Sequence, residues 1–129
     1  MSGKLYVVDW EFSYDGNGYL PIFDIREIPP ADDLTVQVRL QINDDGRPFG
    51  DVFRLDVLCG RDRYNAKQSG KPKNSNWKFI KCERFDPDEV EARILAIVDS
   101  CASDWFTRSL DCLRKHFDWE YEGRKPSAL

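Results

Sequence analysis

The segment LTVQVRLQI, residues 34–42, alternates apolar and polar side chains along its whole length. Successive side chains of a strand point to opposite faces, so this pattern predicts a strand with one apolar and one polar face. The segment VFRLDVLC, residues 52–59, repeats the alternation after the turn sequence NDDGRPFG. Together the two segments predict a hairpin whose apolar face must be covered, and helices packed on that face provide the cover.

Two helices are predicted in the C-terminal half of the chain. In FDPDEVEARILAIVDSC, Asp86 is the expected N-cap and Pro87 occupies the first turn. Apolar residues then recur at helical spacing, which predicts one buried stripe. The second helix is predicted to begin at a cap formed by Ser103 or Asp104 and to run through about Lys115.

The remaining segments complete the predicted order of elements. KLYVVDWEF (4–12), WKFIKCE (77–83) and WEYE (119–122) predict an opening strand, a short strand and a final strand. Residues 60–76 combine Gly, Ser, Asn, Pro and Lys without a period, which predicts a mobile basic loop, and residues 123–129 read as a tail.

The predicted fold class is α+β. It consists of an antiparallel sheet with two C-terminal helices packed on one face and a short final strand. The 129 residues, 41% of them hydrophobic, are enough to bury one core without a metal or a disulfide. We therefore predict a single domain over residues 1–129.

Charge is distributed unevenly along the chain, whose formal net charge is −4. Residues 1–60 carry 5 basic and 11 acidic side chains, residues 61–84 carry 8 and 2, and residues 85–129 carry 6 and 10. The basic segment 61–84 could follow a phosphate backbone, which makes a small nucleic-acid-binding adaptor the alternative function. The flanking acidic blocks would repel nucleic acid, so that partner is not expected.

The residues that usually carry enzyme chemistry are sparse. No phosphate-binding glycine motif is present, and the four cysteines form no C-x-x-C pair. We predict four reduced and largely buried thiols. His116, the single histidine, falls in the last helical turn, where the helix dipole favours it. We therefore predict no catalytic residue, metal or cofactor; a hydrolase would need a pocket lined by His116 and carboxylates.

The start of the sequence has no apolar run behind a basic head, which predicts no secretory signal. No stretch approaches the roughly 20 apolar residues that span a bilayer. These two features predict a cytoplasmic protein without membrane contact.

Three stretches together resemble the immunity protein 8 family of bacterial polymorphic and contact-dependent toxin systems. They are LTVQVRLQINDDGRPFGDVFRLDVLCGRDRY, the helix that ends in IVDSCASDW, and the pattern W-x-x-x-S-L-x-x-L-x-x-x-F-x-W-E-Y-E. The resemblance covers roughly residues 34–122. It implies a non-enzymatic protein that binds and neutralises a cognate toxin domain, with a nuclease as the expected toxin. By charge and expected exposure, we predict toxin contacts at Asp44 and Asp45 of the hairpin tip and at Glu120 and Glu122.

Overall fold

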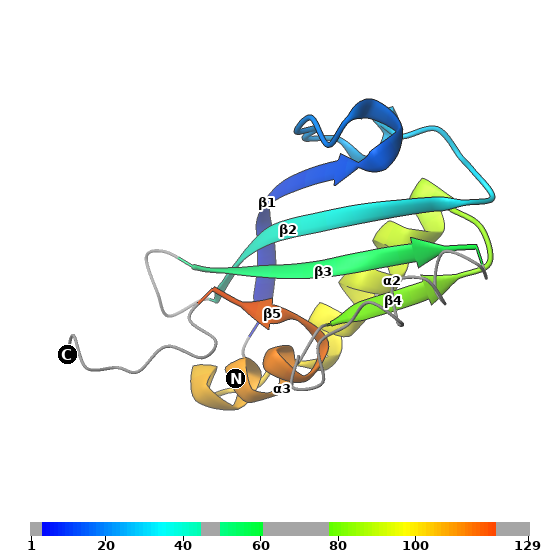
Figure 1. Cartoon of the computed structure of the whole chain (residues 1–129). Coiled ribbons are helices and arrows are strands. Elements are labelled where there is room, and N and C mark those ends of the chain that lie inside the picture. The colour runs from blue at the N-terminus through cyan, green and yellow to red at the C-terminus, as the bar shows by residue number, and fades with distance from the viewer. Residues whose placement is uncertain (1–3, 45–49, 61–77, 121–129) are drawn as a thin grey trace, which may run out of the picture.

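The computed structural model describes residues 4–44, 50–60 and 78–120 (Figure 1). The sheet is built from β1 (Leu5–Tyr14), β2 (Leu34–Asp44), β3 (Asp51–Cys59), β4 (Phe79–Cys82) and β5 (Asp118–Trp119). β1, β2 and β3 are antiparallel neighbours in that order. β4 and β5 share the outer edge of β3, where β4 is parallel to it and β5 antiparallel.

The alternation read in the sequence is confirmed in β2 and β3. Apolar side chains of both strands lie on the face that carries the core, and the polar face holds residues such as Arg39 and Arg54. Two short 3-10 turns, η1 (Asp15–Asn17) and η2 (Ile25–Glu27), lie between β1 and β2.

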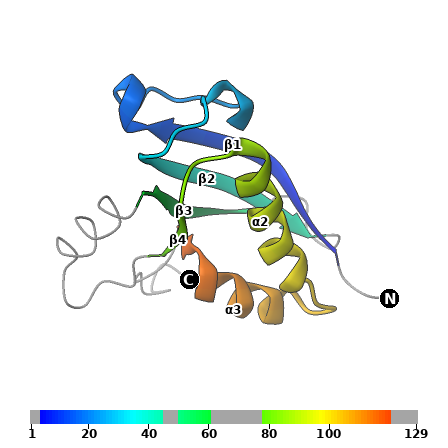
Figure 2. The ribbon, with the colours of Figure 1, turned by 90° about the vertical axis from the view of Figure 1, so that its right-hand side faces the viewer.

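Two helices, α2 (Pro87–Ser100) and α3 (Phe106–His116), lie on the same side of the sheet (Figure 2). The predicted α+β class, with two C-terminal helices on one face of the sheet and a short final strand, is therefore confirmed. The core between helices and sheet contains fully buried side chains from both layers, among them Val38, Leu40, Phe53, Leu55, Ile94, Leu113 and Phe117. Removing each such side chain from water contributes about 1.5–3 kcal/mol.

The predicted start of α2 is confirmed in detail. Asp86 is extended, and its side chain accepts a hydrogen bond from the backbone N–H of Asp88 at 3.1 Å. The predicted cap of α3 is wrong, because the N-cap is Trp105 and it makes no side-chain capping bond. Ser103 instead accepts a hydrogen bond from the backbone N–H of Trp105 at 3.4 Å, one residue before the helix.

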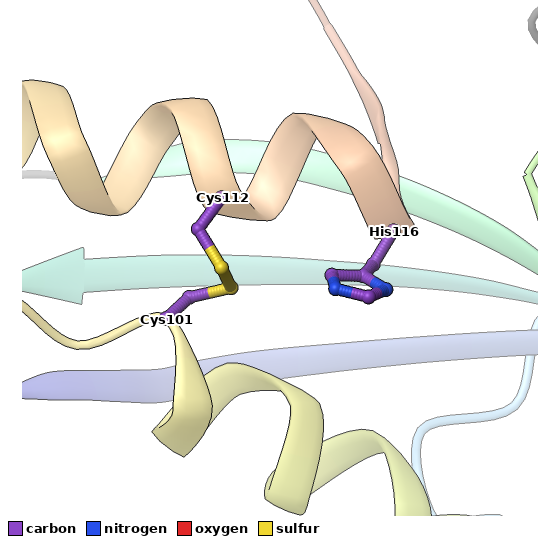
Figure 3. Close-up of side chains that lie close together, drawn as sticks. All are labelled: Cys101, Cys112 and His116. Atoms are coloured by element: carbon purple, nitrogen blue, oxygen red, sulfur yellow. A yellow bond between two sulfur atoms is a disulfide. The ribbon is translucent and has the colours of Figure 1, made fainter.

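The prediction of four reduced cysteines is wrong for two of them. Cys101 and Cys112 form a disulfide, with Cα atoms 5.3 Å apart (Figure 3). The physical reason is the short turn between the helices, which brings the end of α2 against the second half of α3. Cys59 and Cys82 are free and buried, as predicted.

Candidate functional site

The structure describes two of the four predicted toxin contacts, Asp44 and Glu120. Asp45 and Glu122 lie outside the described residues, as do the hairpin tip, the basic loop apart from Gly60, and the tail. Asp44 is the last residue of β2 and is only partly exposed. Its Oδ1 atom is buried and has no hydrogen-bond partner in the described part of the chain. Asp44 is therefore less available to a partner than an exposed tip residue.

Glu120 has a structural contact that the sequence did not indicate. Its Oε2 atom accepts a hydrogen bond from the backbone N–H of Val52 at 2.7 Å, and its own N–H donates to the Val52 carbonyl at 3.0 Å. These two bonds continue the pairing of β5 with β3 by one residue. Before it in the strand, Trp119 packs against the core, and the Arg114 guanidinium lies 5.2 Å from its ring centroid. The carboxylate of Glu120 therefore serves the fold.

A larger group of carboxylates gathers where η2 meets the start of α2. We call residues 24–33 and 83–91 the acidic end. These two segments carry nine acidic and two basic side chains, a net charge of −7. The whole chain has a net charge of −4, so the rest of the chain, with 17 basic and 14 acidic side chains, has a net charge of +3.

Backbone and side-chain contacts hold the two segments of the acidic end together. Ala31 and Phe85 exchange both backbone hydrogen bonds, at 3.3 and 2.6 Å. Arg84 lies 3.6 Å from Asp32 in an exposed ion pair. Beneath this surface, four apolar side chains are almost wholly buried: Ile25, Ile28, Phe85 and Val90. The backbone that carries these carboxylates is therefore held in place by buried side chains and hydrogen bonds.

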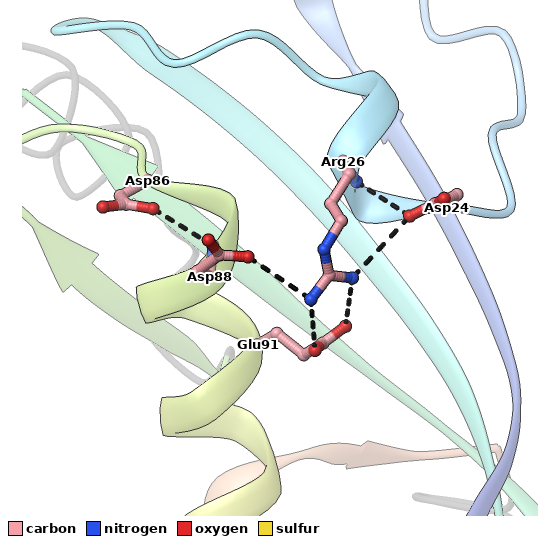
Figure 4. A network of polar contacts seen from close by, with 5 residues as sticks. All are labelled: Asp24, Arg26, Asp86, Asp88 and Glu91. Carbon is pink, nitrogen blue, oxygen red and sulfur yellow. Dashed lines mark hydrogen bonds and ion pairs between the residues drawn. The ribbon is translucent and has the colours of Figure 1, made fainter.

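Arg26 lies at the centre of the acidic end and contacts three carboxylates (Figure 4). Its guanidinium pairs with both oxygens of Glu91, at 3.3 and 3.1 Å, the two-pronged geometry in which arginine holds a carboxylate best. Asp88 follows at 3.3 Å and Asp24 at 3.9 Å. The hydrogen bond to Glu91 and the charges of Glu91, Asp88 and Asp24 raise the pKa of Arg26. This arrangement shows that the carboxylates here are placed to receive a guanidinium.

The N-terminus of α2 adds a partial positive charge to the acidic end. The unpaired N–H groups of a first helical turn are equivalent to roughly half a unit charge. Asp86, Asp88 and Glu89 surround this turn, so they offset the dipole several times over. The surface therefore presents a negative potential, which suits a basic partner.

The polar face of the sheet is a second candidate site and is nearly balanced in charge. The strand register places Glu11 opposite Arg39, Arg39 opposite Arg54, and Arg54 opposite Asp118. These residues line a shallow hollow of about 450 Å³. Directly opposed like charges destabilise a sheet, and the two outer acids offset the central arginine pair. Because two acids flank the two arginines, this row of side chains gives the face no strong preference for a charged partner.

The hollow next to His116 differs from the pocket that a hydrolase would need. It measures about 300 Å³ and is lined by Lys78, Phe79, Ile80, Ile97, Lys115 and His116. None of these described lining residues carries a carboxylate. His116 is the last residue of α3, as the sequence predicted, and its ring lies beside the disulfide.

The free cysteines form a second pair on neighbouring strands. Cys59 and Cys82 are opposite each other in the parallel pairing of β3 and β4. Arg93 donates a hydrogen bond to the Cys82 sulfur at 3.2 Å. The hydrogen bond with Cys59 and the charge of Arg93 lower the pKa of Cys82 to about 7, although burial acts in the opposite direction. Cys82 is therefore an acidic thiol in a nearly closed site.

No protein-family model, no curated protein and no solved structure matches this sequence. The resemblance to the immunity protein 8 family therefore stays a prediction made from the sequence.

The lengths and compositions of α2 and α3 differ from those of membrane-spanning helices. In residues 4–44, 50–60 and 78–120, no helix is long and apolar enough to cross a bilayer.

Proposed function

We propose that this protein is a non-enzymatic immunity protein that binds and neutralises a cognate bacterial toxin through its acidic end. The toxin would be met in the cytoplasm of the producing cell, a reducing compartment that would hold Cys101 and Cys112 as thiols. The observation that supports the proposal is the net charge of −7 on residues 24–33 and 83–91, mounted on a packed scaffold. An inhibitor needs such a preformed surface, because binding then costs little ordering of side chains.

The chemistry of the acidic end suits a partner rich in arginine and lysine. Opposite charges on two proteins raise their encounter rate, and arginine forms two-pronged bonds with carboxylates. Nucleases bind phosphate through basic clefts, so a nuclease is the toxin class that best complements this surface. Arg26 already occupies part of the acidic end, and a partner arginine would compete with it for Glu91 and Asp88.

The contacts predicted from the sequence are partly replaced in this proposal. Glu120 is assigned to the fold by its bond to Val52. Asp45 and Glu122 lie outside the described residues, so their toxin contacts stay predictions. The contact at Asp44, the last described residue before the gap at 45–49, also stays a prediction. The alternative of a nucleic-acid adaptor also stays a prediction, since residues 61–77 of its basic segment are outside the described structure.

Co-expression in cells tests the proposal. The protein encoded by the gene immediately upstream is produced with and without this chain, and cell survival is measured. We expect the upstream protein to be toxic alone and harmless with this chain. Rescue should fail for Glu27→Lys with Glu89→Lys, which reverses one exposed acid in each segment of the acidic end.

A matched control carries the same change of charge elsewhere. Asp99→Lys with Asp111→Lys alters exposed acids of α2 and α3 outside the acidic end, and it should still rescue. Equal rescue by both double variants would refute the assigned surface. An upstream protein that is harmless alone would remove the support for a toxin partner.

A further inference from the structure

Cys101, Cys112 and His116 form a compact group of potential metal ligands (Figure 3). Cys112 and His116 are four residues apart on α3, which places both side chains on one face of the helix. Cys101 is the C-cap of α2 and faces them across the helix–helix contact. One ligand atom from each residue lies within 4.8 Å of the other two.

We propose that Cys101 and Cys112, when reduced, bind a zinc ion together with His116. Thiolate and imidazole are ligands that zinc prefers in proteins. Cys112 and His116 have the i, i+4 spacing by which two ligands on one helix face bind a single zinc ion. The disulfide and the metal-bound form are then two mutually exclusive states of one site. The inference does not depend on the proposed toxin binding.

Conversion between the disulfide and the zinc-bound form requires a two-electron reductant in one direction and a two-electron oxidant in the other. A dithiol reductant transfers two electrons and two protons to the Cys101–Cys112 bond and becomes a disulfide itself. Zinc then displaces the two protons from the thiols and binds the resulting thiolates. Oxidation of the thiolates by a disulfide of the same class releases the zinc and restores the bond.

The geometry of the group suits a tetrahedral ion. Zinc–sulfur and zinc–nitrogen bonds of roughly 2.3 and 2.0–2.1 Å place the two sulfurs roughly 3.8 Å apart, and each about 3.5 Å from the nitrogen. The three ligand atoms now lie within 4.8 Å of one another. After reduction, side-chain rotations must part the two sulfurs and set the imidazole nitrogen at about 3.5 Å from each of them.

The group would leave the fourth position of the ion open. Among the described residues the group supplies three ligands, one fewer than a tetrahedral ion takes, and the His116 side chain is exposed. Solvent or an added ligand can therefore reach the ion, as in zinc sites that keep an open position. Cys101 is buried, so the ion would lie at the boundary between core and solvent.

The other cysteine pair has the opposite character. Cys59 and Cys82 are buried, and the cation of Arg93 donates a hydrogen bond to Cys82. A guanidinium next to the sulfur repels a divalent cation, and the single histidine of the chain is already placed in the first group. Zinc binding is therefore assigned to one pair only.

Cobalt titration tests the proposal, because tetrahedral cobalt with thiolate ligands gives intense absorption bands. The full chain is reduced with a phosphine and titrated with Co²⁺, and zinc is then added to displace it. We expect one equivalent of cobalt with a thiolate-to-metal band in the wild type. The same result is expected in Cys59→Ala with Cys82→Ala, which retains only the proposed ligands.

His116→Ala should weaken cobalt binding at least about 100-fold, since losing a ligand costs more than losing an outer-shell contact. Lys115→Ala, one residue earlier and also exposed, is the matched control and should bind as the wild type does. Circular dichroism verifies that each variant is folded. Absence of a thiolate band in the reduced wild type, or equal affinity in His116→Ala, would overturn the proposal.

Discussion

Replacing Glu120 with alanine removes the carboxylate that accepts a hydrogen bond from the Val52 N–H at 2.7 Å. A hydrogen bond to a charged group contributes about 1.5–3 kcal/mol, and an unsatisfied buried donor costs about 1–3 kcal/mol. Val52 and Glu120 are both partly exposed, so water satisfies the freed N–H in part. We therefore expect Glu120→Ala to lower the free energy of unfolding by about 1–2 kcal/mol.

Glutamine at position 120 separates the hydrogen bond from the charge. Its amide oxygen can still accept from Val52, so Glu120→Gln should cost less than about 1 kcal/mol. Glu83→Ala removes an exposed glutamate and should stay within about 0.5 kcal/mol of the wild type. Urea unfolding at neutral pH gives the three values, provided that the m value is unchanged. If alanine cost no more than glutamine at position 120, the structural role of this carboxylate would be refuted.

Three further predictions concern stability. Asp86→Ala removes the acceptor for the Asp88 N–H and should cost about 0.5–2 kcal/mol, whereas Asp86→Ser should restore most of it in thermal unfolding. Reducing the Cys101–Cys112 bond, which joins residues 11 apart, should lower the free energy of unfolding in metal-free buffer by about 3 kcal/mol; an unchanged value would contradict the bond. Because the pKa of Cys82 is lowered from 9.0 to about 7, its thiolate stabilises the fold at high pH, and this contribution is lost as the pH falls through 7. Urea unfolding of the wild type should therefore gain stability from pH 7 to 9, and Arg93→Leu should flatten this rise.

Features that depend on neighbouring residues were predictable from the sequence. The alternation in residues 34–42 depends only on the two-residue repeat of a strand, and it predicted the buried face of β2. Asp86 followed by Pro87 defines a helix start within a few residues, and α2 begins there. In contrast, the start of α3 depends on how the chain turns after Cys101, and the local capping signals at Ser103 and Asp104 did not place it.

The acidic end was not predictable from the sequence, because tertiary contacts assemble it. Arg26 and Glu91 are 65 positions apart, and no sequence pattern links them. The disulfide was missed for the same reason, since a spacing of 11 residues acquires meaning only when α3 folds back on α2. The role of Glu120 depends on the pairing of β5 with β3, which two residues of strand do not specify by themselves.

The association rate with the protein encoded by the upstream gene tests the central claim most directly. Stopped-flow fluorescence measures it at low and high salt for the wild type and for Glu27→Lys with Glu89→Lys. If the acidic end guides binding, this variant should associate at least about tenfold more slowly at low salt and lose most of its salt dependence. Asp99→Lys with Asp111→Lys should change the rate by less than about threefold. Equal slowing in the two double variants, or a wild-type rate independent of salt, would contradict the account.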